Sequence, residues 1–431
     1  MKYLRNAAMY GVLGLLTIHS NASQEASIPS VNKIWELVQA QQIEIENLKI
    51  ALAAAQQSVE IQEQKVKITE ERLDSTADYV ELIAQNNVTD QPTSFTERTS
   101  IGGYGELHYS NVNTTASDKN SKQADFHRYV LFFEHEFSDT WQFYSEFELE
   151  HAFSEDTADG SNSGAVELEQ AFVQKALNER HYVRSGVFML PIGTLNEIHE
   201  PPYFYGVERN DVESIIIPAT WWEAGAGVGG YYANGLSWDF AVNTGLEMPT
   251  TGLNAFRVRS GRQKVSNANA SNLAYTLRGS YTGTQGLAVS ASLHHQSDIS
   301  QFSGDGVGSA NLLTLNGSYT WESFSLKALW SQWNMQGALV KAVGAGKQTG
   351  WYVEPAWTFQ INRKRTGIYA RYEDLDAARN RDKFDQWEVG LNYWPTNNLV
   401  FKMDYRERTH DLGSEQGLNF IAFDLGLGYN F

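Results

Sequence analysis

The side chains best suited to chemistry in this sequence are its histidines. His294 and His295 are adjacent, and neighbours on a strand point to opposite faces, so they cannot bind one metal ion together. The sequence contains no HExxH, GxSxG or P-loop motif. A lone His135, His151 or His295 near the rim of a β-barrel leaves a hydrolase as the hypothesis from another class. We expect no enzymatic activity, no metal site and no cofactor.

Composition excludes several other classes of protein. The chain has 33 Lys+Arg against 51 Asp+Glu, and a net charge of -18 makes it a poor ligand for nucleic acid. It has no cysteine, so disulfide scaffolds and Cys-ligated metal sites are excluded. The only long apolar run lies at the N-terminus, which argues against a helical membrane protein. Aromatic residues at 13%, with 35 Gly and only 9 Pro, favour a large β-structure with many turns.

The N-terminus has the pattern of an export signal. Lys2 and Arg5 precede an apolar stretch, and Ser20-Asn21-Ala22 is a small-x-small cleavage site. A membrane anchor is the alternative, but about 12 apolar residues are too few to cross a bilayer. We therefore predict a signal peptide over residues 1–22, followed by a short segment over residues 23–30.

Residues 31–84 have the heptad pattern of an α-helical coiled coil. An apolar residue occupies every seventh position without a break: Val31, Val38, Ile45, Leu52, Val59, Val66, Leu73 and Val80. A lone amphipathic helix is the alternative, but so narrow an apolar stripe would stay wet. The intervening core positions include Gln and Thr, which do not decide between a dimer and a trimer. We expect an oligomeric periplasmic coiled coil, then a linker over residues 85–99.

From residue 100 to residue 431 the apolar period changes to two. In the last segment, apolar Ile421, Phe423 and Leu425 alternate with small or polar residues. Similar segments start near residues 101, 125, 140, 166, 181, 222, 235, 272, 286, 310, 323, 349, 365, 384, 398 and 420. The connections between them alternate between short and long. A soluble β-sandwich would be much shorter, so this pattern predicts an all-β transmembrane barrel of about 16 antiparallel strands in the outer membrane.

Inward positions of such a barrel would face water and passing solutes. Near the start of the barrel these positions are mainly acidic, beside Arg128: Glu134, Glu136, Glu146, Glu148 and Glu150. Towards its end they are enriched in basic residues: Lys327, Arg371, Lys402, Arg406 and Arg408. Two such walls would set a transverse field across the lumen. The alternative is an ordinary solvated lumen in which these charges pair between neighbouring strands.

The third long connection, residues 191–221, is the candidate constriction loop. Its chemistry-bearing residues are Glu197, His199, Glu200, Glu208, Arg209, Asp211 and Glu213, with a net charge of about -4. If it folds inward, we expect an acidic constriction that passes cations or neutral solutes more readily than phosphate. If it lies outside, the same acids would bind divalent ions at the lipopolysaccharide surface.

Four stretches of the sequence resemble a known family. They are GVFMLPIG at residues 186–193, VERN at 207–210, IPATWWEAG at 217–225 and IYARYEDLD at 368–376. The chain resembles the phosphate-selective porin O and P family of trimeric, 16-stranded outer-membrane porins. Phe431 resembles the terminal assembly signal of such barrels. The resemblance implies a homotrimer, contact with outer-membrane lipid and lipopolysaccharide, and insertion by the barrel assembly machinery.

The charge of the barrel region departs from the pattern of the phosphate-selecting members, which rely on a basic channel lining. Residues 99–431 carry about -13, since the total of -18 includes about +2 in residues 1–22 and about -7 in residues 23–98. We expect a porin for diffusion of small hydrophilic solutes or ions, with mild cation preference. The alternatives are a porin selective for anions such as phosphate or dicarboxylates, using the basic wall, and a structural envelope tether.

Overall fold

The computed structural model describes residues 95–115, 119–151, 164–302, 307–378, 382–411 and 418–431. The signal peptide, the coiled coil and most of the linker lie outside these residues, so those predictions stay predictions. A 3-10 turn, η1 (Phe95–Arg98), precedes the first strand. Among the described residues, no helix is long and apolar enough to cross a membrane.

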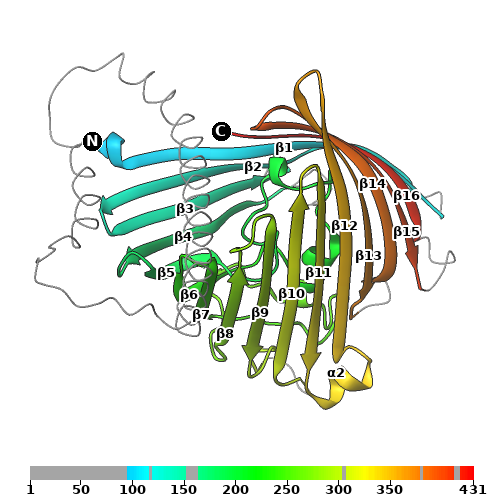
Figure 1. Ribbon diagram of the computed structural model, residues 1–431. Coiled ribbons are helices and arrows are strands. Elements are labelled where there is room, and N and C mark those ends of the chain that lie inside the picture. Colours follow the sequence, from blue (N-terminus) through cyan, green and yellow to red (C-terminus); the bar gives the residue numbers. More distant parts are fainter. Residues whose placement is uncertain (1–94, 116–118, 152–163, 303–306, 379–381, 412–417) are drawn as a thin grey trace, which may run out of the picture. The chain divides into compact units, whose positions relative to one another are not determined.

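Sixteen antiparallel strands close into a barrel in the described part of the chain (Figure 1). The strands are β1 (Thr99–Thr114), β2 (Ser121–Ser138), β3 (Trp141–Glu150), β4 (Val166–Ala176), β5 (His181–Met189), β6 (Trp222–Tyr231), β7 (Leu236–Asn243), β8 (Ala274–Tyr281), β9 (Leu287–Gln296), β10 (Ala310–Trp321), β11 (Phe324–Met335), β12 (Lys347–Ile361), β13 (Lys364–Asp376), β14 (Lys383–Thr396), β15 (Leu399–His410) and β16 (Phe420–Asn430). Each strand pairs with its neighbours in sequence, and β1 pairs with β16.

The alternation of side chains across each strand is confirmed. On β16, Ala422 and Asp424 are buried inside the barrel, whereas Ile421, Phe423 and Leu425 are exposed on its outer face. The alternation of short and long connections is confirmed as well. The first long connection is shorter than expected, because β1 and β2 extend beyond the apolar residues that marked them in the sequence.

Main-chain hydrogen bonds between the first strand and the C-terminal residue close the ring of strands. The amide of Gly103 donates to the carbonyl of Phe431, and the amide of Phe431 donates to the carbonyl of Gly103, both at 2.9 Å. The Phe431 ring lies on the outside, stacked with Tyr129 and Tyr429. Closure leaves no strand edge unpaired, which a bilayer requires.

Phe431→Lys is expected to reduce assembly strongly, because it puts a flexible cation where an aromatic ring completes the seam. The measurement is the yield of heat-modifiable protein in the membrane fraction, with Phe431→Trp as the aromatic control. Wild-type yield for the Lys variant would contradict the assembly role of this residue.

Two long loops occupy the interior beside β9 to β13. Loop L3 (residues 190–221) contains η3 (Pro201–Tyr203) and the short π-turn η4 (Val212–Ile216), and loop L4 (residues 244–273) contains η5 (Val258–Gly261). A short helix, α2 (Ala338–Ala342), lies between β11 and β12. Apolar side chains of L3 and L4 share one buried cluster with inward residues such as Leu312, Leu329 and Trp333.

That cluster corrects one expectation, namely that inward residues face water. Leu312, Leu329 and Trp333 are inward and almost fully buried, because they pack against the loops. The run of Ile215, Ile216 and Ile217 in L3 carries much apolar surface, and covering it from water is favourable. On this side, the inner faces of the strands are therefore covered by L3 and L4.

Candidate functional site

Loop L3 lies against inward side chains from widely separated strands. Glu373 on β13 accepts hydrogen bonds from the amides of Asp211 (2.8 Å) and Val212 (3.3 Å). Lys402 on β15 donates to the carbonyl of Gly206 at 2.8 Å, and Ser292 on β9 donates to that of Pro191 at 3.0 Å. A loop that bonds to the inner faces of β9, β13 and β15 lies within the barrel.

Most of the predicted acids of L3 are already paired. Glu197 forms an ion pair with Arg278 on β8, and Asp211 forms one with Arg408 on β15. Glu208 lies 3.1 Å from Nδ1 of His108 on β1. The negative charge of the loop is therefore largely balanced by cationic or hydrogen-bonding partners from the barrel wall.

Glu213 has a structural position in L3. Its side chain is fully buried, and Oε2 accepts hydrogen bonds from the amides of Thr194 and Leu195, each at 2.7 Å. Oε1 accepts a hydrogen bond of 3.0 Å from the hydroxyl of Tyr352 on β12. A carboxylate held by this many donors fixes the fold of the loop.

The other predicted loop residues lie beside β3. Nε2 of His199 is 3.3 Å from Oε1 of Glu146, and one oxygen of Glu200 is buried without a hydrogen-bond partner in the described structure. Arg209 donates to the carbonyl of His199 at 3.2 Å. Among the described residues, Arg209 forms no ion pair with a carboxylate.

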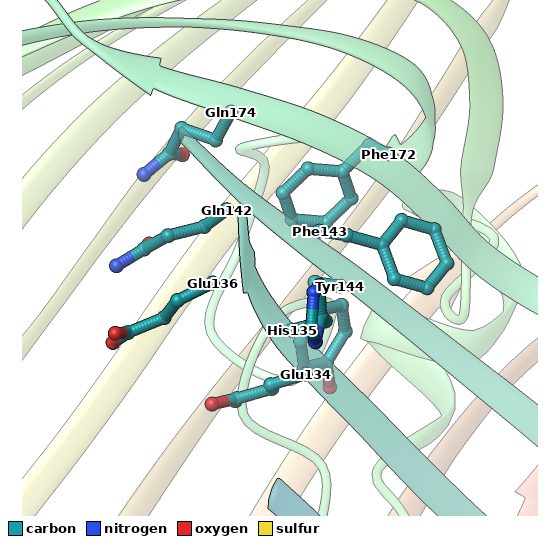
Figure 2. Close-up of a pocket in the computed structure, with 8 residues that line it drawn as sticks. All are labelled: Glu134, His135, Glu136, Gln142, Phe143, Tyr144, Phe172 and Gln174. Carbon is teal, nitrogen blue, oxygen red and sulfur yellow. The ribbon is translucent and has the colours of Figure 1, made fainter. Parts of the chain in front are cut away.

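The predicted acidic wall divides into two parts. Glu146 and Glu148 on β3 are buried beneath the loops, and Glu150 is half-buried. Glu134 and Glu136 are exposed near the short-turn end of β2, where Figure 2 shows them beside Gln142 and Tyr144 at a small pocket of about 180 Å³. Only the second part is open to solvent.

Most side chains of the predicted basic wall also have partners. Arg128 lies 2.7 Å from Glu106, Arg406 lies 2.7 Å from Asp424, and Lys327 is half-buried across from Glu354 in the register of β11 and β12. Lys402 and Arg408 hold L3. Arg128, Arg406, Lys402 and Arg408 therefore anchor the structure, which makes them poor candidates for a free ion path.

Arg371 is the most heavily bonded residue of the basic wall. It is buried and donates to Glu354 (2.9 Å), to Glu388 (3.0 Å) and to the carbonyl of Tyr205 in L3 (2.7 Å). A guanidinium with three partners on two strands and a loop acts as a clamp.

Arg371→Met is expected to destabilise the folded barrel by about 3–5 kcal/mol, because it leaves two buried carboxylates without their cation. The temperature at which the folded electrophoretic band is lost measures this effect, with the exposed Arg363→Met as the control. An unchanged temperature combined with altered ion selectivity would instead place Arg371 on the permeation path.

Loop L4 contributes arginines that sequence analysis did not single out. Arg259 donates to the carbonyls of Ser214 and Ala219, and Arg262 to that of Thr220. Burial, together with the nearby charge of Arg262, lowers the pKa of Arg259 to about 9, so the side chain stays protonated at neutral pH. Among the described residues, Arg259 forms no ion pair with a carboxylate.

A cavity of about 290 Å³ lies between L3, η5 and the first strands. Its lining residues are Glu106, His108, His127, Arg128, Leu195, Val207, Glu208, Arg209, Asp211, Glu213, Ser214, Ala219, Arg259 and Arg406. Glu106, Glu208 and Asp211 of this lining are engaged in the pairs described above, and Glu213 is held by hydrogen bonds. In the described structure, by contrast, the hydrogen bonds of Arg209 and Arg259 go to main-chain carbonyls, and neither guanidinium group has a carboxylate partner.

Histidines and carboxylates gather at several places along this wall. In the described residues, four groups place their ligand atoms within 4.8 Å of one another: His108, His127 and Glu208; Asp125, His127 and His151; Glu146, Glu169 and His199; and Glu148, Glu167 and Glu169. By contrast, His294 is buried inside the barrel and His295 is exposed outside, as strand alternation predicts.

A strand irregularity explains why sequence analysis missed two members of these groups. Glu106 pairs with Arg128 and Leu107 with Phe126, so His127 is an extra residue on β2. Glu169 is the corresponding extra residue on β4, because Glu146 pairs with Gln170 and Phe147 with Leu168. A β-bulge redirects its extra side chain, and strict alternation cannot place it.

Comparison with known proteins identifies the fold and a family. The family model described as phosphate-selective porin O and P matches residues 100–431. An uncharacterised protein of Aquifex aeolicus (strain VF5) is 36% identical over 194 residues, which cover 45% of this chain and 43% of that relative. The alignment thus spans less than half of the relative.

Two solved structures share the barrel fold. The anion-selective porin of Comamonas acidovorans has a TM-score of 0.52 at 12% identity, covering 77% of this chain and 99% of that one. Salmonella typhi OmpF, in complex with daunomycin, has a TM-score of 0.51 at 15% identity, covering 77% of this chain and 97% of that one.

Proposed function

Because the chain belongs to the phosphate-selective porin O and P family, we propose that it forms a diffusion channel for small hydrophilic solutes and ions, with a preference for anions. It is a β-barrel porin of the outer membrane. The observation that carries the proposed preference is the pair of arginines, Arg209 and Arg259, that line the inner cavity without carboxylate partners in the part of the chain that the structure describes.

The proposed constriction consists of L3 and η5 facing β1 and β2. Unpaired guanidinium groups in a narrow, partly desolvated passage attract anions and repel cations. The acids of L3 have less influence than their number suggests, because Glu197 and Asp211 are paired with arginines and Glu213 is buried. This local balance outweighs the acidic total of the chain, which includes many distant residues.

The acidic constriction expected from the loop composition remains the competing proposal. It predicts cation preference, and the exposed Glu134 and Glu136 near one end of the barrel favour it. Measurement in a planar bilayer across a gradient of KCl at low ionic strength separates the two. A reversal potential of the sign set by chloride supports our proposal, and the opposite sign contradicts it.

The same recording tests the remaining alternatives. A structural envelope tether would give no conductance steps, and a hydrolase would release product from lipid or peptide substrates. We infer a channel without catalytic activity, so we expect steps and no hydrolysis. The porin of Comamonas acidovorans that shares the fold is anion-selective, so anion passage is the first property to measure.

We also propose the environment of the channel. The mature chain would form a homotrimer in contact with outer-membrane lipid and lipopolysaccharide, after insertion by the barrel assembly machinery. The exposed apolar residues on the outer face, such as Leu315, Trp357 and Phe401, suit contact with lipid or a second copy. The coiled coil predicted over residues 31–84 would lie in the periplasm.

A further inference from the structure

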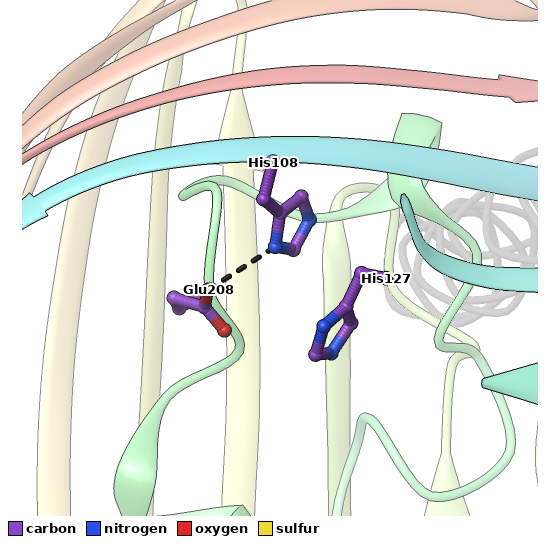
Figure 3. A group of neighbouring side chains, drawn as sticks. All are labelled: His108, His127 and Glu208. Atoms are coloured by element: carbon purple, nitrogen blue, oxygen red, sulfur yellow. Dashed lines mark hydrogen bonds and ion pairs between the residues drawn. The ribbon is translucent and has the colours of Figure 1, made fainter. Parts of the chain in front are cut away.

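We propose that His108, His127 and Glu208 form a binding site for a divalent transition-metal ion of the zinc class, open to the cavity between L3 and the wall. One ligand atom from each residue lies within 4.8 Å of the other two. Figure 3 shows the three side chains converging from β1, β2 and L3. Two imidazoles and one carboxylate are a ligand set that zinc binds, leaving a further position for water or solute.

The distances between the three side chains are close to those of ligands on one metal ion. Nδ1 of His108 lies 3.1 Å from Oε1 of Glu208, close to the separation of two ligands on one metal ion. The rings of His108 and His127 are stacked, with centroids 4.6 Å apart and planes inclined by 13°. A ring nitrogen of His127 already lies within 4.8 Å of the ligand atoms of the other two residues, so we expect a small movement of the ring to bring it to the same ion.

One ring nitrogen of each histidine already lies beside a carboxylate. Nε2 of His108 lies 3.2 Å from Oε2 of Glu106, and Nδ1 of His127 lies 3.0 Å from Oδ2 of Asp125. A carboxylate that accepts one ring N–H fixes the tautomer and leaves the other nitrogen as a metal ligand. Glu106 thus directs Nδ1 of His108 towards Glu208, and Asp125 leaves Nε2 of His127 available.

The bulge on β2 is what brings the second histidine into the group. In a regular strand, neighbouring residues point to opposite faces of the sheet. His127 would then point away from the lumen, which its neighbour Arg128 faces. The bulge instead places the ring of His127 over that of His108. Bulges occur often beside functional sites, because they aim a side chain that regular pairing would turn away.

The charges in direct contact with the three ligands suit a divalent ion, and Arg209 and Arg259, which line the same cavity, form no hydrogen bond or ion pair with them in the described structure. The neighbouring cations Arg128 and Arg406 are paired with Glu106 and Asp424. With both histidines neutral, Glu208 and Asp125 leave two negative charges, which one divalent ion would balance. Because Glu208 belongs to L3, a bound ion would also join the loop to β1 and β2.

Zn²⁺ titration of the full-length, chelator-treated protein in detergent tests the site directly. We expect one ion bound per chain, and weakening by at least tenfold in each of Glu208→Gln, His108→Gln and His127→Gln. Co²⁺ in place of Zn²⁺ should give the visible absorption of a site with nitrogen and oxygen ligands. His181→Gln, which changes a histidine on β5 outside all four groups, is the matched control.

A second group, which shares His127 with the proposed site, provides a result that would contradict the proposal. If His151→Gln removes binding while Glu208→Gln does not, the ion lies between Asp125, His127 and His151 instead. Absence of stoichiometric Zn²⁺ binding to the folded wild-type protein would also overturn it. Heat-modifiable migration confirms that each variant is folded, and binding is measured without conduction, so failure here is distinct from failure of the proposed channel.

Discussion

Replacing Arg209 and Arg259 together by glutamine is expected to remove the anion preference of the channel. Both guanidinium groups line the inner cavity and have no carboxylate partner within the described ranges of the chain, so we expect their charges to act on passing ions. A unit charge about 4 Å from an ion contributes about 1 kcal/mol even at the dielectric constant of water, or about fivefold in relative permeability per charge. Reversal potentials measure the shift, which should be largest at low salt and should fade as the Debye length falls to about 3 Å at 1 M.

Two control variants separate charge from loop geometry. Arg209→Lys with Arg259→Lys keeps the charges while it loses the planar hydrogen-bond geometry, so it should keep the anion preference. Arg363→Gln removes one positive charge from an exposed turn and should have no effect. If the glutamine variant keeps the anion preference, these two arginines are not the selectivity determinants.

Trp333→Ala is expected to release L3 and to increase single-channel conductance. The indole N–H of Trp333 donates to the carbonyl of Ile216 at 2.7 Å, and its ring is fully buried among L3 and L4 side chains. Truncating a buried tryptophan costs about 3–5 kcal/mol of folding free energy. Because β11 stays paired with β10 and β12, we expect this loss to weaken the packing of L3 rather than the sheet. Larger, noisier conductance steps in a planar bilayer would record this change.

Trp330→Ala is the matched control, since Trp330 lies on the same strand with the opposite parity. It should lower stability somewhat and leave conductance unchanged. Equal conductance for Trp333→Ala and the wild type would mean that L3 keeps its position without this anchor, and therefore that the apolar cluster is not what holds the constriction.

The barrel was predictable from the sequence because its determinant is local. Alternation of residues such as Ile421, Phe423 and Leu425 with small or polar ones sets each strand, and loops of alternating length set the order. Fifteen of the sixteen expected starts lie within two residues of those observed, and the exception is β2, which starts at Ser121 rather than near residue 125.

The interior was less predictable because its determinants are non-local. Nothing near Asp211 in sequence indicates that Arg408 neutralises it, and nothing near Arg371 indicates that Tyr205 caps it. Inward Trp333 resembles any other strand residue until L3 is seen to cover it. Composition predicts the sum of charges, but the field in a passage depends on which charges remain unpaired.

The long-range anchors of L3 have a consequence for the order of folding. The amide of Val207 donates to Asp404 at 2.6 Å, and Lys402 donates to the carbonyl of Gly206, across 197 and 196 residues of chain. Contacts between residues so far apart form late, since a long segment must first be brought together at an entropic cost. We therefore expect L3 to reach its final position only after β15 has joined the sheet, so the passage beside the loop takes its final width late in folding.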